Sequence, residues 1–195
     1  MFSFDWDSIN NFIESHILDY SSRMPKIKLP PSVFKEAISA PFEDKVIESL
    51  REMNFQAGHV TEKGIWLIQT GAVNLNWTEK QAVYGEVDVL AYDSEMNLAI
   101  LVECKVINDI RDYKSYKNII SKLSDNSEGY YDKLLKKKEW IDPALSKKYN
   151  KEVSAVSIIL TDIPIPVINI PDRGVVLTDY GEFMGTLLGI IGKGK

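Results

Sequence analysis

The stretch that most constrains the fold is residues 85–107, whose pattern predicts a β-hairpin. Its two arms, residues 85–92 and 97–107, are rich in Val, Ile, Leu and Tyr, and a polar turn separates them. Short β-branched and aromatic runs bounded by turn-forming residues are typical of paired strands. Because both arms are apolar at nearly every position, we expect a sheet that helices cover on both faces.

Four charged residues interrupt this apolar hairpin, two on each arm. In an antiparallel hairpin, the numbers of two facing residues add up to a constant. For a turn of even length centred between positions 95 and 96, that constant is the sum of 95 and 96. This register pairs Asp88 with Glu103 and Glu86 with Lys105. Side chains alternate along a strand, so all four are expected on one face, with facing Cβ atoms about 5 Å apart. A turn of odd length would instead direct Asp88 away from Glu103 and Lys105.

Two carboxylates at this separation need a positive partner. At an effective dielectric constant of 20, repulsion between Asp88 and Glu103 is roughly 3 kcal/mol. A proton or Lys105 offsets one of the two charges, whereas a divalent cation offsets both. The hairpin therefore predicts a metal site, and Mg²⁺ suits it because Mg²⁺ takes oxygen ligands and needs only one or two carboxylates.

The same residues carry a family resemblance. Asp88, fourteen intervening residues and then Glu103-Cys104-Lys105 resemble the D…ExK motif of the PD-(D/E)XK, or restriction-endonuclease-like, nuclease superfamily. The segment Gly85-Glu86-Val87-Asp88 is similar to its Holliday-junction-resolvase-like and Mrr-like branches, although Val87 stands where many members have proline.

The resemblance implies roles for these residues. Asp88 and Glu103 would ligate Mg²⁺, with Mn²⁺ as a substitute, and the backbone carbonyl of Cys104 would be a further ligand. Lys105 would position or activate the attacking water.

Two further glutamates have alternative interpretations. The spacing of Glu43 predicts a first-turn acid that complements a helix dipole, whereas the resemblance implies a glutamate directed at the metal. Glu86 either pairs with Lys105 or joins the metal site.

The order of expected elements is helix, three strands, long helix, two strands, helix. By the resemblance this is the α/β, restriction-endonuclease-like core α-β-β-β-α-β, a central mixed sheet flanked by helices, here with an N-terminal helical extension. We expect a helix and linker over residues 1–38 and the nuclease-like domain over residues 39–195. The expected elements are a helix at 4–22, a linker at 23–33, a helix capped by Ser39, a strand at 65–69 followed by a loop, the hairpin, a helix at 112–140 with a break near 124–129 and ended by Pro143, strands at 153–161 and 174–178, and a final helix capped by Asp179.

The charge distribution bears on the partner. The chain has a net charge of −5, yet residues 105–151 hold 12 Lys and Arg against 7 Asp and Glu. A basic segment beside an acidic metal site suits a phosphodiester substrate. Lys133, Lys136 and Lys137 are expected to face outward, either contacting backbone phosphates or forming a solvated helix face.

Several classes of protein are disfavoured. Phosphate-loop, GxGxxG, GxSxG and HExxH motifs are absent, and a single cysteine, Cys104, leaves no disulfide framework. The two histidines, His16 and His59, are expected to be structural. No apolar run is long enough for a membrane helix, so we expect a cytoplasmic protein.

The leading hypothesis is an Mg²⁺-dependent endonuclease, with nucleic acid, expected to be DNA, as its partner. A homodimer is an expectation from the resemblance alone. The alternatives are a catalytically silent nuclease-fold module that binds nucleic acid or a protein, and an ordinary salt-bridge patch on a sheet face.

Overall fold

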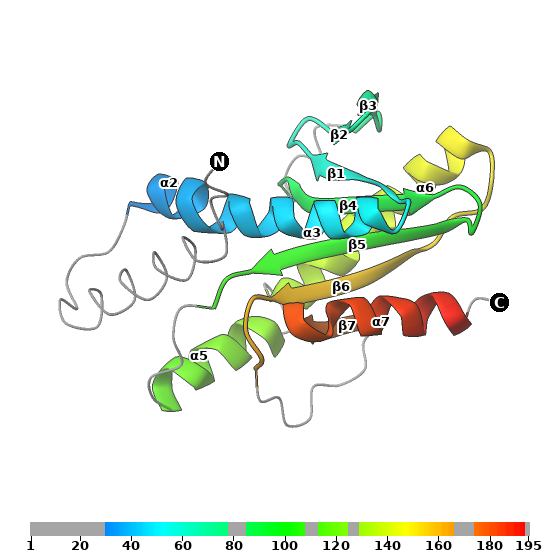
Figure 1. Cartoon of the computed structure of the whole chain (residues 1–195). Helices are drawn as coiled ribbons and strands as arrows, with labels where there is room; N and C mark the ends of the chain where they lie inside the picture. Colours follow the sequence, from blue (N-terminus) through cyan, green and yellow to red (C-terminus); the bar gives the residue numbers. More distant parts are fainter. Residues whose placement is uncertain (1–29, 78–84, 108–112, 125–128, 166–173, 194–195) are drawn as a thin grey trace, which may run out of the picture. The chain divides into compact units, whose positions relative to one another are not determined.

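The computed structural model divides the chain into two units, Met1–Ala37 and Ile38–Lys195. It describes all residues except 1–29, 78–84, 108–112, 125–128, 166–173 and 194–195. The helix expected at residues 4–22 therefore lies outside the described residues. Unit Ile38–Lys195 contains the sheet, the hairpin and every candidate site residue (Figure 1).

A seven-strand mixed sheet forms the centre of this unit, in the order β3-β2-β1-β4-β5-β6-β7. Strands β5, β6 and β7 are parallel to one another, and the remaining neighbours are antiparallel. The strands are β1 (Gln56–Val60), β2 (Ile65–Ile68), β3 (Gly71–Asn74), β4 (Val87–Asp93), β5 (Leu98–Lys105), β6 (Ala155–Thr161) and β7 (Val175–Asp179).

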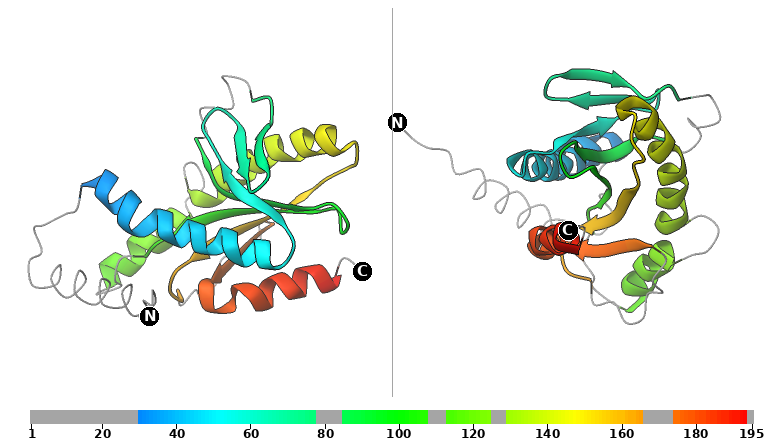
Figure 2. Two further views of the ribbon diagram at one scale, coloured as in Figure 1. Left: turned by 45° about the horizontal axis from the view of Figure 1, so that its top comes forward. Right: turned by 90° about the vertical axis from the view of Figure 1, so that its right-hand side faces the viewer.

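Helices cover both faces of the sheet, as Figures 1 and 2 show. One apolar cluster packs α3 and α7 against one face, and a second packs α5 and α6 against the other. The α/β class with a mixed, helix-flanked sheet is thus confirmed. The helices are α2 (Pro31–Phe34), the π-helix η1 (Lys35–Ser39), α3 (Ala40–Glu52), α5 (Tyr113–Ser124), α6 (Tyr130–Tyr149) and α7 (Tyr180–Lys193). No helix among the described residues is long and apolar enough to cross a membrane.

The predicted hairpin is confirmed, and its register is as expected between the Val89–Val102 pair and the turn. The expected pairs Asp88–Glu103 and Glu86–Lys105 lie beyond the last paired residues. Val89 pairs with Val102, and every paired position of β4 and β5 has the expected sum. The turn is stabilised by Asp93, whose Oδ1 accepts hydrogen bonds from the backbone N–H groups of Glu95 and Met96 at 2.7 and 2.9 Å. Six consecutive residues of β5 are buried, which agrees with a strand covered on both faces.

The sequence prediction missed two strands. The strand expected at 65–69 is confirmed as β2. β1 precedes it and was missed because it contains Gly58 and polar residues, and β3 falls in the expected loop and is only four residues long. β1 inserts between β2 and β4, and the pairing of β1 with β4 shifts between Gly58 and Val60. Next to this irregularity, the side chain of Val87 packs in the apolar cluster on the α6 side of the sheet. Regular alternation of side chains along β4 would have placed it on the opposite face.

Two helix boundaries also differ from prediction. Ser39 has helical backbone angles and makes no capping hydrogen bond, because helical structure already begins at Pro31. Pro143 lies inside α6, which ends at Asn150 in the left-handed region. Ile141 and Leu145 are fully buried on either side of Pro143, so packing against the sheet maintains the helix across the proline. The predicted cap of α7 is confirmed by the Asp179 Oδ1, which accepts a hydrogen bond from the Gly181 N–H at 2.8 Å.

Gly58 is expected to be intolerant of any side chain. An added Cβ would lie 1.6 Å from the backbone oxygen of Leu67, so β1 and β2 would have to separate. We predict that Gly58→Ala lowers the free energy of urea unfolding by about 2–3 kcal/mol. Gly185→Ala is the control, because its Cβ would meet nothing within 4 Å on α7. It should raise stability by about 0.5–1 kcal/mol, and equal effects of the two substitutions would contradict the close approach.

Candidate functional site

The carboxylates of Asp88 and Glu103 come together where the pairing of β4 with β5 ends. The last paired residues are Val89 and Val102. Beyond them, the Asp88 Oδ2 accepts a hydrogen bond of 2.8 Å from the backbone N–H of Cys104. The side chains of Asp88 and Glu103 are only 12% and 11% exposed. The sequence therefore predicted correctly that two poorly solvated carboxylates share this end of the hairpin.

Two ammonium groups bind Glu103, one on each carboxylate oxygen. The Lys105 Nζ lies 2.7 Å from Oε1 and 3.7 Å from the Asp88 Oδ2. The Lys137 Nζ on α6 lies 2.8 Å from Oε2. The prediction that Lys137 faces outward is wrong, because this residue is 5% exposed and points at the site.

The inward position of Lys137 has a signal in the sequence. Leu134, Lys137, Ile141 and Leu145 recur at spacings of three and four residues, which place them on one face of a helix. All four are buried. The run of three lysines suggested a solvated face, but the periodicity assigns Lys137 to the apolar stripe.

Tyr130 is a residue of this site that the sequence analysis did not indicate. It begins α6, and its ring centroid lies 4.8 Å from the Lys105 Nζ, in the geometry of a cation–π contact. Lys105 is therefore held between the aromatic ring and the two carboxylates.

The electrostatic environments of the two carboxylates differ. Burial and the nearby charge of Glu103 raise the pKa of Asp88 to about 6, against opposing effects of Lys105, Lys137 and the Cys104 N–H. Burial also disfavours the charge of Glu103, but Lys105 and Lys137 outweigh it and hold the pKa of Glu103 below its ordinary value. Burial likewise opposes the charge of Lys105, yet the two acids raise the Lys105 pKa above its usual value. Asp88 is thus the group whose charge is incompletely compensated.

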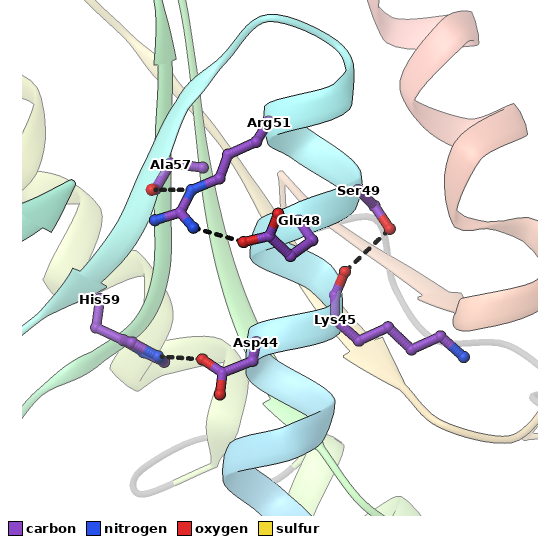
Figure 3. Close-up of polar contacts among 7 residues, drawn as sticks. All are labelled: Asp44, Lys45, Glu48, Ser49, Arg51, Ala57 and His59. Atoms are coloured by element: carbon purple, nitrogen blue, oxygen red, sulfur yellow. Dashed lines mark hydrogen bonds and ion pairs between the residues drawn. The ribbon is translucent and has the colours of Figure 1, made fainter. Parts of the chain in front are cut away.

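Glu43 lies on the first turn of α3, where its side chain is 14% exposed. Its Oε2 lies 3.6 Å from the His59 Nδ1, and the His59 Nε2 lies 3.4 Å from the Asp44 Oδ1. Figure 3 shows His59 on β1 directed toward Asp44. No partner was predicted for His59, because the strand that carries it, β1, was not predicted. Burial has the largest effect in raising the pKa of the Cys104 thiol, and the charges of Asp88 and Glu43 raise it further. Glu43 therefore lies near this end of β5.

The other candidate residues are more exposed than the cluster of Asp88, Glu103, Lys105 and Lys137. Glu86 precedes β4 and is exposed. Lys133 and Lys136 are exposed on α6, as predicted.

The donor set suits a hard divalent cation in part. Asp88 and Glu103 supply carboxylate oxygens, and Mg²⁺ requires only one or two carboxylates when substrate phosphate completes its coordination. Within the described part of the chain, however, no group of three or more His, Cys, Asp or Glu side chains is placed to hold a metal ion. Glu43 and Glu86 therefore add no third ligand to the pair in this arrangement.

Comparison with known proteins gives no further guidance: no protein-family model, curated protein or solved structure matches the chain.

The raised pKa of Asp88 predicts a pH-dependent stability. A carboxyl group with a higher pKa in the folded state binds its proton more tightly there, so stability falls as the pH rises from about 4 to about 6. Asp88→Asn removes this effect, and its amide oxygen can still accept the Cys104 N–H. We expect the variant to match the wild type near pH 4 and to exceed its unfolding free energy by about 2–3 kcal/mol near pH 7. A difference independent of pH in urea unfolding would contradict this origin.

Glu103→Gln is expected to act in the opposite direction. It leaves the buried ammonium of Lys137 and the partly buried ammonium of Lys105 without their shared charged partner. Breaking a buried ion pair on one side is strongly destabilising, and we expect a loss of about 3 kcal/mol at neutral pH, measured by urea unfolding. Glu62→Gln, at an exposed position in the turn after β1, is the control and should change stability by less than about 0.5 kcal/mol.

Proposed function

We propose that the chain is an Mg²⁺-dependent nuclease of the restriction-endonuclease-like fold that hydrolyses phosphodiester bonds, with DNA as its substrate. The single observation that carries the proposal is the cluster at the end of the hairpin. Asp88 and Glu103, the two acids of the D…ExK motif, come from adjacent strands and lie beside the Lys105 ammonium with little access to water.

Each residue of the cluster has a role in this proposal. Asp88, Glu103 and the Cys104 carbonyl would hold the cation, which polarises the scissile phosphate and lowers the pKa of a bound water. Lys105 orients that water or stabilises the negative charge that develops at phosphorus. The ring of Tyr130 restricts where the Lys105 ammonium can lie. Glu43, which contacts His59 on the α3 side of the sheet, is assigned to a second cation or to a water-mediated contact.

The approach of a polyanionic substrate is supported by α6. The exposed Lys133 and Lys136 lie on the helix that also supplies Lys137, so a phosphate backbone along α6 would meet positive charge next to the acidic pair. Such contacts position a substrate without reading its sequence. A homodimer would place two such sites on the two strands of a duplex.

One observation favours a second candidate, a catalytically silent module that binds nucleic acid or a protein. Both oxygens of Glu103 are engaged by lysines, and the two acids and two lysines of the cluster balance in charge. A site balanced without a metal ion can be purely structural. Metal binding and cleavage distinguish the two candidates.

The decisive experiment incubates supercoiled plasmid and branched DNA with the full chain and Mg²⁺ or Mn²⁺. We expect nicking that EDTA prevents, and a loss of at least about 100-fold in rate for Asp88→Asn and Lys105→Met. Asp88→Asn is the informative variant, because it is expected to be the more stable protein and its inactivity cannot be explained by unfolding. Glu62→Gln should cleave at the wild-type rate. Absence of cleavage of DNA or RNA, together with no stabilisation by Mg²⁺ in thermal unfolding, would favour the silent module.

A further inference from the structure

Lys137 is an unusual member of the cluster, because a buried lysine from a helix occupies one oxygen of a carboxylate assigned to metal binding. Its Nζ lies 2.8 Å from the Glu103 Oε2, and the residue is 5% exposed. Leu134 and Ile141, on the same face of α6, are fully buried, so Lys137 belongs to the apolar stripe of the helix and its ammonium lies at the site. Glu103 thus gives Lys137 a counter-charge that its apolar surroundings cannot supply.

A cation at Glu103 would compete with this ammonium. The Oε1 is already taken by Lys105 at 2.7 Å, and a divalent ion at the Oε2 would lie against the charge of Lys137. Like charges in a poorly solvated site repel strongly. Glu103 can bind the cation and the Lys137 ammonium together only at a high cost in electrostatic free energy. Binding of the metal therefore requires a new anionic partner for Lys137.

Lys105 is less able than Lys137 to leave the Glu103 carboxylate. Besides Glu103, Lys105 has the Asp88 Oδ2 at 3.7 Å and the Tyr130 ring at 4.8 Å, both of which hold its ammonium in place. Lys137 reaches the cluster from α6 and forms an ion pair with Glu103, and its charge also acts on Asp88. The side chain of Lys137 can therefore change partner through its own torsions alone.

We propose that Lys137 is an exchangeable counter-ion that couples metal binding to substrate binding. Without substrate it occupies Glu103 and disfavours the metal ion; when a phosphodiester enters, its ammonium moves to a phosphate oxygen and frees the Glu103 Oε2 for the cation. This inference rests on the proposed function and adds to it an order of events: metal and phosphodiester bind cooperatively. Lys137 acts through Glu103 and is a positioning residue for the metal.

The test measures binding, independently of turnover. Calorimetric titration with Ca²⁺, which also takes oxygen ligands, is carried out on the full chain with and without a short DNA duplex. For the wild type we expect the duplex to tighten Ca²⁺ binding about tenfold or more, within the usual range of coupling between sites. For Lys137→Met we expect Ca²⁺ alone to bind about tenfold more tightly than to the wild type, and the tightening by DNA to fall below about twofold.

The control is Lys147→Met, which removes the same charge from an exposed position of α6 and should retain the wild-type coupling. Lys137→Gln, which can still donate a hydrogen bond to Glu103, is the second variant and decides the matter if Lys137→Met does not fold. Coupling that persists in the Lys137 variants, or is missing from the wild type, overturns the inference while metal-dependent cleavage still supports the proposed function. A wild-type protein that binds no divalent cation overturns both.

Discussion

The organisation of this end of the molecule depends on two ion pairs that share the Glu103 carboxylate. This carboxylate accepts Lys105 from its own strand and Lys137 from α6, and the site is largely removed from water. Buried charges are tolerated only when each has a partner at hydrogen-bonding distance. The ion pairs therefore fix the position of α6 over β5 more specifically than the surrounding apolar contacts can, because leucine and isoleucine side chains have no required partner.

The topology explains why these groups meet. β5 and β6 are parallel, so the chain must cross over between them, and α5 and α6 make that crossing on one face of the sheet. The crossover brings the start of α6 to the carboxyl end of β5, where Glu103 and Lys105 lie. The opposite face is covered by α3 and α7, which brings Glu43 to the other side of the same strand end.

The cluster is balanced in total charge but not residue by residue. Glu103 has two ammonium partners within 2.8 Å, whereas Asp88 has an ammonium at 3.7 Å and a backbone N–H, and burial together with the charge of Glu103 raises the pKa of Asp88 to about 6. The two carboxylates of the cluster therefore lie in unequal electrostatic environments, although they share one end of the hairpin.

The sequence by itself determined the hairpin, its register, the shared face of Asp88 and Glu103 and the cap at Asp179, because these depend on strand alternation, turn chemistry and capping between residues close in the chain. Only the tertiary structure decided the ion pair of Lys137 with Glu103, the continuation of α6 through Pro143 and the pairing of His59 with Asp44. Each of these depends on contacts between segments distant in the sequence. Helical spacing places Lys137 on the apolar stripe of α6, but only the folded chain brings a carboxylate to its ammonium across the helix–sheet interface.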